Sequence, residues 1–191
     1  MTELPTDSEG AMALLMQHVN QPNLIKHCIA TEAIMRRLAE KLGADEELWA
    51  MIGLLHDLDF EKTKETPSLH TKIATQILEE EGFSPEFTRA IRSHNEQVDG
   101  WERSEPVDYA LTAAESVTGL IVAAALVRPE KEDRLVHVKV SSLKKRMREK
   151  AFARNVNRDS VRECEKLGLS LDEFLELALD AMRAIGGELG L

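Results

Sequence analysis

The fold is decided by residues 24–57, which read LIKHCIATEAIMRRLAEKLGADEELWAMIGLLHD. The part up to residue 42 repeats apolar or small side chains at helical spacing and predicts one amphipathic helix, with an inner face made of Leu24, Cys28, Thr31, Met35, Leu38 and Leu42. Gly43 is a favourable stop signal, and Asp45 can cap the next helix. That helix, over residues 48–55, is almost wholly apolar, which predicts a central and buried position. It ends in the dipeptide His56-Asp57.

The rest of the chain carries the same kind of helix signals and predicts an all-α fold. We expect helices over residues 8–19, 66–81, 84–97, 106–127, 144–153 and 160–166, and a last helix after Ser170, where Glu173 completes a capping box. Residues 135–140 alternate apolar and polar side chains, which favours a short extended segment. The sequence has no linker and no internal repeat, so residues 1–191 are predicted to form a single domain.

Composition and charge limit the classes of partner and of compartment. The 191 residues carry a net charge of −10, which disfavours binding to a nucleic-acid duplex or to an anionic membrane, since both need Lys and Arg. The longest strongly apolar stretch, Ser116–Val127, is shorter than the roughly 20 residues that a membrane helix requires. The acidic start MTELPTDSEG does not resemble a signal peptide, and Cys28 and Cys164 form no metal or disulfide motif. We therefore expect a cytoplasmic protein, and the sequence leaves a homo-oligomer open.

Four histidines and two acidic residues fall where helices are expected to face the core. They are His27, His56, His70 and His94, with Asp57 and Glu115, the last being the only charged residue in 109–127. Burying so many titratable groups is costly unless something pairs with them. Imidazole and carboxylate ligands suit Fe, Mn, Ni, Co or Zn. The pattern therefore favours a divalent metal site, with a structural polar core of paired histidines and carboxylates as the alternative.

The order of these residues resembles the HD superfamily of metal-dependent phosphohydrolases. The segments KHCIATEAIMRRLAEKLG and LLHDLD are similar to the first two motifs of its HDIG-type members, and the resemblance covers about residues 23–127. It implies an HD-like helical bundle with a C-terminal helical extension over residues 128–191. It also implies one metal held by His27, His56, Asp57 and Glu115, and a second held by His70 and His94 with Asp57 as the bridge. The family usually has Asp where this chain has Glu115.

The resemblance implies a phosphohydrolase that acts on a small phosphate ester, such as a nucleotide, with one or two metal ions per chain. Asp57 would be the catalytic ligand, and metal-bound water would be the source of hydroxide at neutral pH. Because Glu115 replaces the usual Asp, the alternative is a non-catalytic sensory module that binds metal or a phosphorylated ligand. A helical scaffold without metal is the third hypothesis.

Residues 139–150 form the only dense basic stretch of the chain, with six Lys or Arg against Glu149. Lys139, Lys144 and Lys145 of this stretch are candidates for binding substrate phosphate, with Arg128 as a further candidate outside it, and the alternative is a solvated helix face. Two acidic residues just after the His-Asp pair, Asp59 and Glu61, are interpreted as solvated loop residues rather than as partners of the metal ligands.

Overall fold

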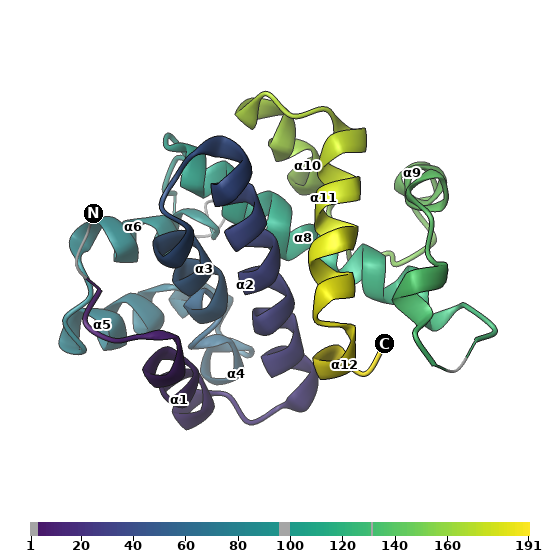
Figure 1. The fold of residues 1–191 in the computed structure, drawn as a ribbon. Helices are drawn as coiled ribbons and strands as arrows, with labels where there is room; N and C mark the ends of the chain where they lie inside the picture. The colour runs from purple at the N-terminus through teal and green to yellow at the C-terminus, as the bar shows by residue number, and fades with distance from the viewer. Residues whose placement is uncertain (1–3, 96–99, 131) are drawn as a thin grey trace.

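The central pair of helices, α2 and α3, forms where the sequence predicts it (Figure 1). This computed structural model describes residues 4–95, 100–130 and 132–191, which contain helices and no strand. Helix α2 spans Pro22–Leu42 and ends at Gly43, whose φ of 68° is the left-handed conformation that glycine adopts at helix ends. Helix α3 spans Glu46–Leu55, and the Asp45 side chain accepts a hydrogen bond from the Leu48 N–H at 3.1 Å. Every residue of 49–59 is buried.

Gly53 brings α3 into direct contact with α2. A Cβ at this position would lie 3.0 Å from the backbone N and Cα of Glu32, so only glycine permits this approach. Around the contact, Ile34, Leu38 and Leu55 are completely buried, and each stabilises the fold by about 1.5–3 kcal/mol. This packing fixes the C-terminal end of α3, with its His-Asp pair, against α2.

Helix α8 (Pro106–Leu126) lies behind α2 in Figure 1 and packs on α2, α10 (Arg158–Arg162), η3 (Glu163–Leu167) and α11 (Leu171–Ala184). It is the one helix in the described part of the chain that is long and apolar enough to cross a membrane, with a mean hydropathy of 1.5. The apolar helix is thus longer than the stretch recognised in the sequence. Because 67% of that window is buried inside the protein, α8 has the character of a core helix.

The remaining elements are short. They are α1 (Ser8–His18), α4 (Phe60–Thr63), η1 (Pro67–Leu69), α5 (Lys72–Glu80), α6 (Pro85–Ser93), η2 (Arg134–His137), α9 (Val140–Arg148) and α12 (Gly186–Leu189). The helix expected from residue 66 begins only at Lys72, because Thr71 has a left-handed φ of 72°. The helix expected to reach residue 97 ends at Ser93, and residues 96–99 lie outside the described residues.

The C-terminal third differs most from the sequence expectations. The extended segment expected over 135–140 is wrong: η2 occupies Arg134–His137, and its turn buries Leu135 and Val138, which are three residues apart. The helix expected over 144–153 lies instead at Val140–Arg148, and the one expected over 160–166 is divided between α10 and η3. The last helix, α11, has the predicted capping box of Ser170 and Glu173.

Candidate metal centre

The four core histidines converge from four elements onto one point between α2, α3 and α6. His27 comes from α2, His56 follows α3, His70 follows η1 and His94 follows α6. Their Nε2 atoms meet in two pairs, with 3.2 Å between His27 and His56 and 3.0 Å between His70 and His94. The ring centroids of His27 and His56 are 5.1 Å apart, so both rings are within reach of one ion.

Each ring has a hydrogen-bond partner on the nitrogen that faces away from this point. His56 Nδ1 lies 2.8 Å from the Gly53 carbonyl oxygen, and His94 Nδ1 lies 2.7 Å from that of Ile91. A carbonyl oxygen can only accept, so both Nδ1 atoms carry a proton. Both Nε2 atoms therefore have a free lone pair when the rings are neutral.

Thr118 determines the tautomer of His27 in the same way. Its hydroxyl donates to the Glu115 carbonyl oxygen at 2.6 Å, so its oxygen accepts from His27 Nδ1–H at 2.9 Å. The Nε2 lone pair of His27 then faces that of His56. Two acceptors at 3.2 Å repel each other unless a cation lies between them, which is the arrangement expected of metal ligands held by outer hydrogen bonds.

Asp57 lies between the two histidine pairs and turns one carboxylate oxygen to each. Oδ2 is 3.7 Å from His27 Nε2 and 3.5 Å from His56 Nε2. Oδ1 is 3.4 Å from His70 Nε2 and 3.6 Å from His94 Nε2. Two groups of potential ligands result, and Asp57 is common to both: His27, His56 and Asp57 on one side, and Asp57, His70 and His94 on the other.

The donor set fits a divalent ion. Ligands that lie about 2.0–2.1 Å from a metal are about 2.9–3.4 Å apart in octahedral or tetrahedral sites, and the two Nε2 pairs lie within this range at 3.2 and 3.0 Å. Neutral imidazoles with one carboxylate suit Fe, Mn, Ni, Co or Zn better than Ca.

The pKa values of the ligands follow from burial and from their neighbours. Burial lowers the pKa of His56 to about 3, so this ring is neutral at pH 7. Burial also lowers the pKa of His70, but hydrogen bonds to Asp57 and Asp59 outweigh this effect and raise it to about 9. For Asp57, burial would raise the pKa, but the surrounding histidines hold it well below its usual value. Without metal, a proton on His70 can thus occupy the place of a cation between His70 and His94.

The metal-free protein is expected to be most stable near pH 6.5. The raised pKa of His70 stabilises the fold below 6.5, and this contribution is lost as the pH rises towards 9. The lowered pKa of His56 acts in the opposite direction, so stability is lost as the pH falls from 6.5 towards 3. The effect of His70 is worth up to about 3 kcal/mol and that of His56 up to about 5 kcal/mol, because a tenfold change in proton affinity is worth about 1.4 kcal/mol. Urea denaturation with a chelator at pH 5, 6.5 and 9 measures this, and a steady rise in stability to pH 9 would contradict it.

Asp59 corrects the interpretation made from the sequence. It is not a solvated loop residue but is completely buried. Its Oδ1 accepts from His70 Nδ1–H at 2.7 Å, and its Oδ2 accepts from the Ala74 N–H at 2.8 Å. Asp59 therefore fixes the ring of His70 from behind. The sequence contains a signal for this, because Asp59 stands between the apolar residues Leu58 and Phe60, directly after the apolar run that ends in His56-Asp57.

Replacing Asp59 with Asn should weaken metal binding by one group of ligands and leave metal binding by the other unchanged. Loss of an outer carboxylate partner typically costs about 10–100-fold in metal affinity. We expect this loss in the group of Asp57, His70 and His94, whereas the group of His27 and His56 should keep its affinity. Calorimetric titration with Mn²⁺ measures the metal affinity of both groups. Glu61→Gln is the matched control, since Glu61 accepts from the backbone N–H groups of Asn20 and Gln21 and belongs to neither group of potential ligands.

Glu115 lies beside the histidines on α8 but is not within either group of potential ligands in the described residues. Its Oε1 accepts from the Ser116 hydroxyl at 2.7 Å. Burial raises its pKa, and His94 and His27 oppose this effect. The other carboxylate of this helix, Asp108, faces elsewhere and forms a two-fold ion pair with Arg89 at 2.8 and 2.9 Å.

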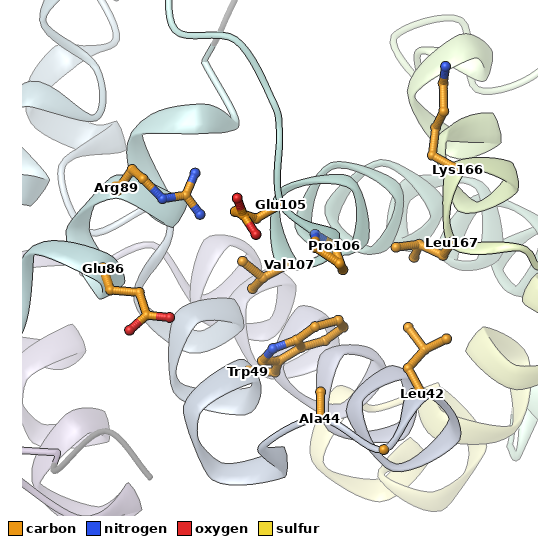
Figure 2. Close-up of a pocket in the computed structure, with 11 residues that line it drawn as sticks. Leu42, Ala44, Trp49, Glu86, Arg89, Glu105, Pro106, Val107, Lys166 and Leu167 are labelled. Atoms are coloured by element: carbon orange, nitrogen blue, oxygen red, sulfur yellow. The ribbon is translucent and has the colours of Figure 1, made fainter.

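A cavity of about 430 Å³ opens onto both histidine pairs, since it is lined by His27 and His94. Polar side chains that the sequence did not single out line it as well: Asn95, Arg103, Thr112, Asn155 and Asn157. A larger cavity of about 660 Å³ is drawn in Figure 2, between Trp49, Arg89, Val107 and Leu167. It is lined by none of the four histidines.

The structure does not bring the basic stretch to the metal centre. Figure 1 shows α9 on one side of α11, whereas α5 and α6, beside the histidines, lie on the other. Lys144 pairs with Asp172, Lys145 with Glu149 and Arg128 with Glu130, and the exposed Lys139 precedes α9. The four residues predicted to bind substrate phosphate are therefore not part of the site proposed below.

Comparison with known proteins gives a family and distant relatives. The HD domain matches residues 24–137. Ribonuclease Y of Desulforudis audaxviator is 33% identical over 92 residues, which are 48% of this chain and 17% of the relative. Ribonuclease Y of Thermobifida fusca is 30% identical over 98 residues, which are 51% of this chain and 19% of the relative.

The chain thus spans less than a fifth of the length of these relatives. No solved structure matches it significantly. The HD match covers more than half of the chain and includes all four histidines, Asp57 and Glu115. By this match, the chain belongs to the HD-domain family of metal-dependent phosphohydrolases.

Proposed function

We propose that this protein hydrolyses a small phosphate ester with the help of one or two divalent metal ions. The observation that carries the proposal is the pair of Nε2–Nε2 contacts on either side of Asp57, each between rings whose other nitrogen is occupied. His27, His56 and Asp57 would hold one ion, and Asp57, His70 and His94 the other. Ions bound there would lower the pKa of a coordinated water and polarise a phosphoryl oxygen.

The residues of the chain supply the remaining requirements of such a reaction. The outer hydrogen bonds from Thr118, Gly53, Asp59 and Ile91 fix the four rings before substrate arrives, which lowers the cost of reorganisation. The cavity beside His27 and His94, at about 430 Å³, is of the size that small-molecule ligands occupy. We expect the protein to act in the cytoplasm, away from membranes, on a soluble phosphorylated compound.

A non-catalytic module that binds metal or a phosphorylated ligand is the second candidate. One observation favours it: the family's usual Asp is replaced by Glu115, and this carboxylate is turned to Ser116. The relatives are named Ribonuclease Y, so an RNA phosphodiester is a further substrate to test. The net charge of −10 argues against binding of a long RNA duplex.

A metal and substrate screen tests these candidates together. Purified protein is analysed for bound metal and then assayed with added Mn²⁺, Ni²⁺, Co²⁺, Fe²⁺ or Zn²⁺ against phosphomonoesters, mononucleotides and a short single-stranded RNA. The proposal expects bound metal and metal-dependent release of phosphate from a monoester. Metal without turnover of any ester would favour the binding module, and cleavage of RNA alone would replace the monoester by a phosphodiester. Absence of any metal binding would overturn both candidates.

A further inference from the structure

The segment over residues 149–157, between α9 and α10, forms a wall of the cavity beside the metal centre. Asn155, Val156 and Asn157 line this cavity together with His27 and His94. The segment lies outside residues 24–137, the part that the HD domain matches. Gly119 of α8 permits its approach, because a Cβ there would lie 3.0 Å from Val156 Cγ2.

Arg158 holds this wall in its conformation. One guanidinium nitrogen, Nη1, donates to the carbonyl oxygens of Ala153 at 2.7 Å and of Val156 at 2.6 Å. The other, Nη2, donates to the carbonyl oxygen of Phe152. Because guanidinium donors have a fixed planar arrangement, the one side chain ties three carbonyl groups of residues 152–156 together. A lysine has a single nitrogen on a flexible stem and cannot reproduce this arrangement.

Apart from Glu115, the polar side chains that line this cavity from the wall and from α8 are uncharged, and three of them have free hydrogen-bonding capacity. Thr112 is 3% exposed, lines the cavity, and its hydroxyl oxygen has no hydrogen-bond partner among the described residues. Asn155 is exposed and has no hydrogen bond within the described part of the chain. Asn157 uses its Oδ1 to cap α10, which leaves its amide N–H groups. A buried hydroxyl without a protein partner is costly, so we expect a water or a ligand group to complete its hydrogen bonds.

We propose that residues 149–157, positioned by Arg158, together with Thr112 select a phosphate ester whose leaving group carries hydroxyl groups, such as a sugar phosphate. This inference rests on the proposed function. The phosphate would lie towards His27 and His94, and the hydroxylated part would lie between α8 and the wall. Neutral amides and hydroxyls can both donate to and accept from sugar hydroxyls, whereas an apolar leaving group would leave them unpaired. Arg158 is a positioning residue, and Thr112 and Asn155 are the contact residues.

The test compares two phosphomonoesters that differ only in the leaving group. Binding of ribose 5-phosphate and of phenyl phosphate to the Mn²⁺-loaded full chain is measured by calorimetry, so that turnover is not required. Thr112→Val keeps the shape and removes the unpaired hydroxyl, so it should fold at least as well as the parent protein. It should weaken ribose 5-phosphate about tenfold, since one unmade hydrogen bond to a buried group has this effect, and leave phenyl phosphate unchanged.

Arg158→Lys should likewise weaken the binding of ribose 5-phosphate and leave the binding of phenyl phosphate unchanged. The number of bound Mn²⁺ ions should not change. Arg162→Lys is the matched control on the same helix, because Arg162 is exposed and pairs with the exposed Glu165 at 2.7 Å, and it should match the parent protein. If Thr112→Val alters neither ligand, or if it weakens both equally, the inference is overturned while the proposed function stands. Selective binding of ribose 5-phosphate without hydrolysis would support the inference and remove the catalytic part of the function. If neither ester binds to the metal-loaded protein, both the inference and the proposed function are overturned.

Discussion

Replacing Asp57 with Asn is expected to remove both metal ions and to reduce metal-dependent hydrolysis by at least about 10³-fold. Asp57 is the only carboxylate shared by the two ligand groups, with one oxygen turned to each histidine pair. Losing a single electrostatic partner of a transition state costs about 10²–10³-fold, and this substitution removes the partner of both ions. Metal analysis after gel filtration and a phosphomonoesterase assay measure the two effects, and a thermal melt verifies the fold.

His94→Ala provides the contrast for this experiment. It removes one ring from the group of Asp57, His70 and His94 and leaves His27 and His56 in place. We therefore expect the second ion to be lost and the first to be retained. If His94→Ala removed all metal while Asp57→Asn kept it, the division of the ligands between two ions would be wrong.

Glu115→Gln is expected to lose most of the activity and part of the stabilisation by metal, whereas Glu115→Asp should keep or improve both. Burial raises the pKa of Glu115, and a divalent cation nearby would lower it again. Metal added at pH 7 should therefore stabilise the protein partly through this carboxylate. Gln keeps the size of the side chain and removes the charge, and Asp restores the usual ligand of the family.

Thermal melts with and without Mn²⁺, together with the phosphatase assay, test this prediction. Ser116→Ala is the control, because it removes the hydroxyl that donates to Glu115 at 2.7 Å and leaves the carboxylate in place. It should retain the melting shift. Equal shifts in the parent protein and in Glu115→Gln would show that Glu115 does not hold metal, and the site would then rest on the four histidines and Asp57.

The sequence predicted those elements whose signals lie within a few residues of one another. Helices α2, α3 and α11 form as expected because their apolar periodicity, the stop at Gly43 and the capping box of Ser170 all act locally. It failed where a local pattern fits two conformations. Residues 135–140 alternate as in a strand, but the turn of η2 instead buries Leu135 and Val138, three residues apart, and leaves Val136 exposed.

The sequence alone identified the all-α class and the four histidines with Asp57 that the fold brings together, because these residues adjoin the apolar runs of the expected helices. Only the tertiary structure decided how they act. Which nitrogen of each ring is free depends on Thr118, which is 91 residues from His27, on Asp59, and on two carbonyl groups three residues before their histidines. The wall held by Arg158 reaches the site only because α10 packs on α8. The contact of Thr118 with His27 and the packing of the wall join residues that are distant in the chain, so no local pattern encodes them.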